Sequence, residues 1–172
     1  MKNMKILGVV LAFAIFAFPC ASYGEDKVFR ITLDEFVLAY NENLQTTKEE
    51  PLIPSQLENM PESRTLGSKK YAIDSNGTLV IAFSKPNNMV AAVMYVGRRV
   101  EPIGKYNSHI MSSIIVLAKT LGPLDSEFKD FILDVLVHNR ASLDTAKVFN
   151  YLDIEVTYTA EKDRRMLIIA RK

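Results

Sequence analysis

The residues best placed to bind a charged group lie between a strand-like run and the helical run that follows it. Two arginines close the first run, and basic and polar side chains open the second. A helix N-terminus carries unpaired N–H groups and partial positive charge, so this arrangement predicts a site for a carboxylate or phosphate on a ligand or partner. A solvated positive rim, compensated by Glu101, is the alternative interpretation. The candidate ligand-binding residues are Arg98, Arg99, Lys105, Asn107, Ser108 and His109.

Motifs for catalysis and for metal binding are absent from the sequence. It contains neither His-Glu-x-x-His nor Gly-x-Ser-x-Gly, and it has no phosphate-binding glycine loop and no Cys-x-x-Cys pair. Ser108 and His109 point in different directions on a helix, because only residues three or four apart share a face. The other histidine, His138, is expected to end its helix, where a cationic side chain is favourable. The sequence therefore predicts no catalytic residue, no metal and no cofactor.

Five methionines beyond the N-terminal segment form a second candidate for recognition. Thioether side chains are flexible and polarizable, so they line an adaptable apolar site or, more ordinarily, fill gaps in a core. These residues are Met60, Met89, Met94, Met111 and Met166.

The N-terminus has the three parts of a cleavable secretory signal peptide. Lys2 and Lys5 precede the apolar run Ile6–Phe18, and the small residues Ser22 and Gly24 stand two apart just before an acidic pair. This pattern predicts a signal peptide over residues 1–24, cleavage after Gly24, and a periplasmic or secreted bacterial protein. The run has 13 residues, whereas a membrane-spanning helix needs about 20. A permanent membrane span is therefore not expected after processing.

The single cysteine, Cys20, raises the alternative of a lipoprotein. Phe18 and Pro19 precede it, and they are poor substitutes for the small residues that such processing prefers, so the alternative is disfavoured. Cleavage after Gly24 leaves 148 residues without cysteine, 19 basic and 20 acidic. This near-neutral balance argues against nucleic acid as a partner, because proteins bind nucleic-acid phosphates through a strongly basic surface.

Residues 25–172 are expected to form a single domain that begins with a helix. Thr32 and Glu35 have the spacing of a capping box. The following apolar residues recur at helical spacing; they are Leu33, Phe36, Val37, Tyr40 and Leu44. Residues 45–70 contain Pro51, Pro54 and Pro61 and predict a long loop with no more than a short helical turn at Ser55–Met60.

Three strands and two helices are expected next. Asn76-Gly77 favours a hairpin turn between Lys70–Ser75 and Thr78–Ser84. A second turn at Lys85–Asn88 leads to Met89–Val96, which is apolar at successive positions and therefore typical of a central strand covered on both faces. One helix is predicted to begin at Asn107-Ser108 and to end at Gly122-Pro123, and the other begins at Asp125 or Ser126.

A C-terminal hairpin completes the predicted fold. Tyr151–Thr159 alternates apolar Leu152, Ile154, Val156 and Tyr158 with polar residues, and a charged turn leads to Met166–Ala170. Together the elements predict an α+β domain in which an antiparallel sheet of about five strands, a three-strand meander plus this hairpin, packs against three helices.

The function predicted on this basis is that of an exported, non-enzymatic protein that binds an envelope protein or a small ligand. One alternative is a small periplasmic hydrolase or isomerase, which requires Asp74, Asp153 or Glu155 to converge in a pocket. Another is an inhibitor or immunity-type protein that acts through the loop at residues 45–70.

Overall fold

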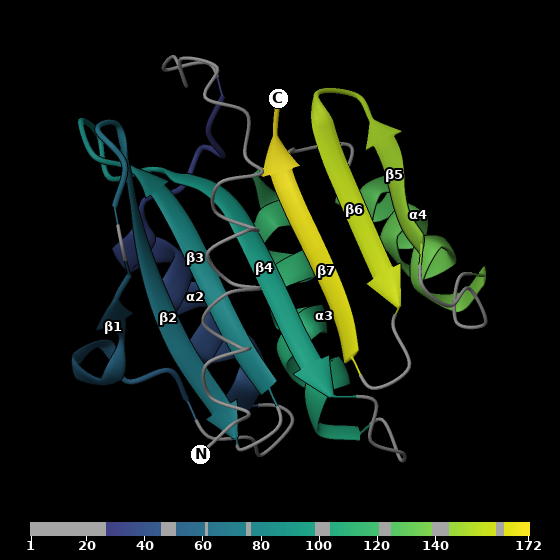
Figure 1. Cartoon of the computed structure of the whole chain (residues 1–172), viewed down its shortest axis with the longest axis horizontal. Helices are drawn as coiled ribbons and strands as arrows, with labels where there is room; N and C mark the ends of the chain where they lie inside the picture. The colour runs from purple at the N-terminus through teal and green to yellow at the C-terminus, as the bar shows by residue number, and fades with distance from the viewer. Residues whose placement is uncertain are drawn as a thin grey trace.

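The computed structural model describes residues 27–45, 51–60, 62–74, 77–98, 104–120, 125–138, 145–160 and 164–172. Within these ranges the chain forms helices on one side of a single antiparallel sheet (Figure 1). In chain order the elements are α2 (Leu33–Gln45), the 3-10 turn η1 (Pro54–Gln56), β1 (Glu58–Asn59), β2 (Leu66–Asp74), β3 (Gly77–Ser84), β4 (Val90–Arg98), α3 (Gly104–Lys119), α4 (Asp125–His138), β5 (Thr145–Tyr151), β6 (Ile154–Ala160) and β7 (Arg164–Arg171).

The strand order of the sheet is β1-β2-β3-β4-β7-β6-β5, with every neighbouring pair antiparallel. The two meanders β2-β3-β4 and β5-β6-β7 therefore meet at their last strands, and β4 lies in the middle of the sheet. Figure 1 shows α2, α3 and α4 behind the strands, all on one face. The α+β class with an antiparallel sheet is confirmed, and the described residues contain seven strands rather than about five.

The two additional strands lie at the edges of the sheet. β1 has two residues, both exposed, and pairs only with β2. β5 carries an exposed Val148, so it lacks the alternation of buried apolar residues that marks a strand in a sequence. β2 also begins at Leu66, so regular structure reaches into the segment that was predicted to be a loop. The sequence pattern is weakest at edge strands because they bury the least side-chain surface.

The capping box at the start of α2 is confirmed. The Thr32 backbone N–H donates to Glu35 Oε2 at 2.9 Å, and the Glu35 N–H donates to Thr32 Oγ1 at 3.3 Å. These hydrogen bonds from the Thr32 backbone and side chain lower the pKa of the exposed Glu35 carboxyl. All the apolar positions predicted for this helix are buried, namely Leu33, Phe36, Val37, Tyr40 and Leu44.

The segment before α2 is tied to the centre of the sheet. The Phe29 N–H donates to the Val90 carbonyl at 2.7 Å, and the Val90 N–H donates to the Ile31 carbonyl at 2.9 Å. Phe29 is fully buried, and the Arg171 guanidinium lies 5.9 Å from its ring centroid. The chain therefore enters the described domain where β4 begins and β7 ends.

Other element boundaries also differ from the sequence prediction. Leu152 was expected on the buried side of a strand, but it is 65% exposed with φ of 53° in the turn between β5 and β6. The tight turn displaces it, and buried alternation begins only at Ile154. Helix α3 begins at Gly104, so Asn107 lies inside the helix rather than at its N-terminus. The turn residue Asn76 and the Gly122-Pro123 stop signal lie outside the described residues.

The main core lies between the helices and the sheet. Alternate residues of each strand face it, including Leu79 and Ile81 of β3 and Val93 of β4. The intervening residues lie on the opposite side of the sheet, where Val80, Met94 and Val96 form a separate buried cluster. We call the helix-packed side the helix face and the opposite side the second face.

Candidate functional site

The predicted anion-binding cluster is only partly covered by the structure. Arg98 is the last residue of β4, and Lys105, Asn107 and Ser108 lie in the first turns of α3. The side chains of these four residues, and the whole of Arg99, lie outside the described part of the chain. The anion site therefore stays a prediction.

His109 is the one member of that cluster whose surroundings are described, and it is 1% exposed. Its Nδ1 lies 2.6 Å from the Tyr40 hydroxyl, and its backbone carbonyl accepts a hydrogen bond of 2.6 Å from the Tyr95 hydroxyl. The Tyr95 hydroxyl also lies 2.8 Å from Ser113 Oγ and 3.2 Å from the Tyr40 hydroxyl. A hydrogen-bonded network thus joins α2, β4 and α3 inside the core.

The tyrosines of this network are held in their neutral form. Burial raises the pKa of Tyr40, and the neighbouring Tyr95 raises it further. Burial likewise raises the pKa of Tyr95, against the opposing effect of its hydrogen bonds to Ser113 and Tyr40. Ser112 and Ser113 are buried as well. Since its members are enclosed by the core, this network ties three elements together and offers no group to a substrate.

The acidic residues proposed for a hydrolase do not come together. Asp74 ends β2 and Glu155 lies in β6, and the strands β3, β4 and β7 separate these two strands. Four strand spacings correspond to about 19 Å. Asp153 lies in the turn between β5 and β6 and pairs instead with Arg171 at the end of β7. The side chain of Asp74 lies outside the described residues.

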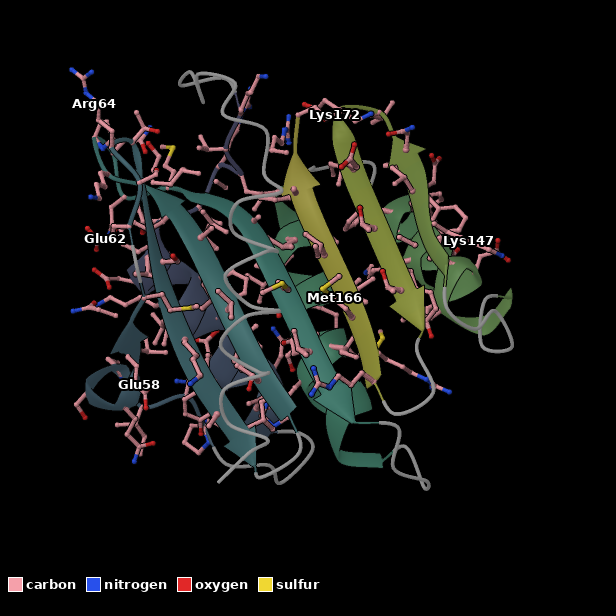
Figure 2. The ribbon with its side chains drawn as sticks, viewed as in Figure 1. Glu58, Glu62, Arg64, Lys147, Met166 and Lys172 are labelled. Atoms are coloured by element: carbon pink, nitrogen blue, oxygen red, sulfur yellow. The ribbon has the colours of Figure 1, made fainter. Side chains whose placement is uncertain are left out.

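The second face carries an apolar stripe along its three central strands. The strand register places Val80 of β3 opposite Met94 of β4, and Met94 opposite Ile168 of β7. Val96 stands opposite Met166, and Figure 2 shows Met166 on the side of the sheet turned away from the helices. By register the stripe consists of Val80, Ala82, Ala92, Met94, Val96, Met166, Ile168 and Ala170.

Three of the five methionines singled out in the sequence gather at this stripe. Met94 and Met166 belong to it, and Met60 packs against the same cluster from the segment beside β1. Met111 packs against the core of the helix face instead. The sequence predicted that Met89–Val96 is a central strand with two apolar sides, and β4 confirms its central place. The sequence alone did not indicate which methionines share a face, because this depends on strand order.

Polar residues flank the apolar stripe on both sides. Toward β2 the second face carries Thr78 and Lys70, and Lys70 Nζ lies 3.4 Å from Glu58 Oε2 at the sheet edge. Toward β6 it carries Thr157 and Thr159. At one end of the stripe Arg98 stands directly opposite Arg164 in the register. An apolar centre with a polar and charged rim is the usual composition of a protein–protein interface.

The Thr159 hydroxyl marks a specific point on this rim. Among the described residues its Oγ1 is buried and makes no hydrogen bond. Thr159 stands opposite Met166 in the register, so the hydroxyl borders the stripe. A buried hydroxyl without a partner costs free energy relative to one that is paired.

Comparison with known proteins finds no family model, no curated protein and no solved structure that matches this chain. Within the described ranges, no helix has both the length and the apolar character needed to cross a membrane. The same residues include no group of three or more His, Cys, Asp or Glu side chains arranged to hold a metal ion.

Proposed function

We propose that this chain is an exported, non-enzymatic binding protein that holds a partner protein on the second face of its sheet. The observation that carries the proposal is the apolar stripe along β3, β4 and β7, on the face opposite all the described helices. An apolar centre rimmed by polar residues is the composition typical of protein–protein interfaces, and this composition supports the proposal.

The placement of the reactive groups favours binding over catalysis. The tyrosines with raised pKa values lie in the core of the helix face, away from the stripe. Asp153 and Glu155 lie at the β5–β6 end of the sheet, distant from Asp74. General acid–base catalysis needs such groups within hydrogen-bond reach of one substrate.

The shape of the stripe favours a protein partner over a small ligand. It spans three adjacent strands, which places its outer rows about 10 Å apart. A surface of this width suits the apolar side of a helix or a short segment from a partner, whereas small ligands are usually enclosed in a concave pocket.

The experiment compares captured partners between variants of the second face and of the helix layer. The bait is the chain carrying a C-terminal tag and purified from the bacterial envelope, so that export has already processed it. Ile168→Glu places a charge in the stripe, and we expect it to reduce capture of any bound envelope protein at least tenfold. Leu38→Glu is the matched control, because Leu38 is 64% exposed on α2.

Capture that is lost in Ile168→Glu and kept in Leu38→Glu, with equal melting temperatures, supports the proposal. Equal capture by both variants would reject the second face as the binding surface. If the unaltered chain retains a small molecule but no protein, and Ile168→Glu loses that molecule, the second face binds a small ligand and the proposal of a partner protein is rejected.

A further inference from the structure

The two edges of the sheet differ in how far they are protected from pairing with another chain. At one edge, β1 consists of Glu58 and Asn59 only, and both side chains are exposed and bonded to lysines of β2. Short edge strands and charged side chains are the usual means of preventing such pairing. At the other edge, β5 has seven residues, of which Lys147 alone is charged (Figure 2). Among the described strands β5 pairs with β6 only, so this edge lacks the protection that β1 gives to the other.

Large apolar side chains are exposed in the elements at the β5 edge. Val148 is 56% exposed in the middle of the strand, and Leu152 is 65% exposed in the turn that follows. Leu133 is 38% exposed on α4, the helix that packs against β5. These are three of the five large apolar side chains that are exposed in the described part of the chain. Exposed apolar surface is therefore concentrated at this end of the molecule.

Helix α4 holds β5 in place. The ring centroid of Tyr151 lies 5.5 Å from that of Phe128 and 5.3 Å from that of Phe131. The Tyr151 hydroxyl also donates to Glu127 Oε2 at 3.3 Å. Because the strand is already ordered by these contacts, pairing with a further strand costs little additional conformational entropy.

The hairpin between β5 and β6 determines which backbone groups of β5 face outward. Tyr151 stands opposite Ile154, with two residues in the turn between them. The residues that flank a two-residue turn form a hydrogen-bonded pair, and such pairs recur at every second position of an antiparallel ladder. The odd-numbered residues of β5 therefore direct their N–H and C=O groups toward β6. The even-numbered residues Ala146, Val148 and Asn150 direct theirs toward the outer edge.

A second copy of β5 matches these outward-facing groups. When two copies lie antiparallel with the whole of Thr145–Tyr151 aligned, the central residue Val148 stands opposite itself, and Ala146 stands opposite Asn150. Every outward-facing residue then meets another outward-facing residue, and each pair can exchange both hydrogen bonds. A shift by one residue would set outward-facing groups against inward-facing ones and would move side chains to the wrong face. The outer edge of β5 is therefore complementary to itself.

We propose that the chain forms a two-fold symmetric dimer in which β5 pairs with β5 of a second copy, so that the two sheets become one. The inference goes beyond the proposed function and does not rest on it, because it concerns the edge of the sheet and not the second face. Closed two-fold dimers are the commonest assemblies of identical chains, and they need only one self-complementary patch. In the joined sheet the two second faces lie on the same side, because paired residues keep their face.

The side chains of β5 are compatible with this pairing. Val148 meets its own copy, so two exposed apolar side chains become buried against each other. On the helix face, Lys147 stands opposite Phe149 of the second copy and not opposite a like charge, which would be destabilising. One diagonal neighbour of Lys147 is Tyr151 of the second copy, whose hydroxyl bonds Glu127. The pairing thus brings the Lys147 ammonium toward a carboxylate of opposite charge.

Sedimentation equilibrium of the chain purified from the bacterial envelope tests the dimer. For the unaltered chain we expect twice the mass of one chain. Val148→Lys places two like charges opposite each other at the two-fold axis, and we expect it to raise the dissociation constant of the dimer at least tenfold. Leu38→Lys is the matched control and is expected to leave the dimer intact, because Leu38 is 64% exposed on α2, away from β5.

Cysteine cross-linking tests the register. Each variant also carries Cys20→Ser, so that the introduced cysteine is the only thiol. The two Val148→Cys residues lie with Cα atoms about 5.5 Å apart, which a disulfide can span. Asn150→Cys is the matched control on the same face, because its two copies lie about 14 Å apart along the paired strands. We expect oxidation to join Val148→Cys chains but not Asn150→Cys chains, and to join Asn150→Cys to Ala146→Cys when the two are mixed.

A dimer that is lost in Val148→Lys, kept in Leu38→Lys and cross-linked in Val148→Cys supports the inference. A monomeric unaltered chain, or a dimer that Val148→Lys leaves unchanged, overturns it. If Val148→Lys lowers the melting temperature, cross-linking decides, because cysteine is close to valine in size and adds no charge. Absence of the Val148→Cys disulfide then contradicts the pairing. The proposed function fails separately, since Ile168→Glu that leaves both capture and the dimer unchanged rejects the second face but not the dimer.

Discussion

The two faces of the sheet are built by the same strands and differ in what they carry. The helix face packs large aromatic and aliphatic side chains against α2, α3 and α4, and it encloses the tyrosine network. The second face is apolar only along β3, β4 and β7, with threonine and charged residues toward its edges. The difference predicts that the stability of the fold comes mainly from the helix face, and the second face is the surface that we propose for recognition.

The largest expected effect separates the two faces by their contribution to stability. Phe36 is fully buried on the helix face, and Phe36→Ala is expected to lower the free energy of unfolding by about 3–5 kcal/mol because it leaves a cavity. Met166 is half-buried on the second face, and Met166→Ala is expected to cost about 1 kcal/mol. Urea unfolding measures both, and equal losses would contradict the division of roles.

The next expected effect is a loss of stability at alkaline pH, and it arises from two tyrosines of the helix face. In the unfolded chain, tyrosines ionise near pH 10, but burial keeps Tyr40 and Tyr95 protonated above that pH in the fold. Above pH 10 the folded state binds more protons than the unfolded state. The contribution of these tyrosines to the free energy of unfolding is therefore fully present below pH 10 and decreases as the pH rises above it. The slope is up to about 1.4 kcal/mol per pH unit for each tyrosine.

Urea unfolding at several pH values between 9 and 11.5 checks this slope. Tyr40→Phe removes one of the two groups and is expected to halve the pH dependence, while it also lowers stability near neutral pH by about 1–3 kcal/mol because His109 Nδ1 loses this hydrogen bond. Tyr158→Phe, in β6 on the same face, is the control. An unchanged slope in Tyr40→Phe would show that the network does not control alkaline unfolding.

The helix face was largely predictable from the sequence, whereas the second face was not. Buried periodicity in α2 and α4 and the Asn76-Gly77 hairpin signal are local patterns, and they located these elements correctly. Leu152 was misplaced because a tight turn interrupts the alternation of Tyr151–Thr159. The stripe depends on β7 pairing with β4, a contact between residues more than 65 positions apart. His109 shows the same limit, since its partner Tyr40 lies 69 residues away and was identified only as an apolar helix position.

The smallest expected effect tests the second face by a gain in stability rather than a loss. The Thr159 hydroxyl is buried without a hydrogen bond among the described residues, so Thr159→Val removes an unpaired polar group while it keeps the shape of the side chain. We expect the free energy of unfolding to rise by about 1 kcal/mol, measured by urea unfolding against Thr157→Val on the same face of β6.

The same substitution is expected to leave partner capture unchanged, because the Thr159 hydroxyl is buried beside the apolar stripe and is therefore out of reach of a partner on the surface. Stability would then rise at this residue without a change in binding, so Thr159→Val separates the two properties. A loss of capture in Thr159→Val would show that the partner reaches the hydroxyl, and the contact surface would then extend beyond the apolar stripe.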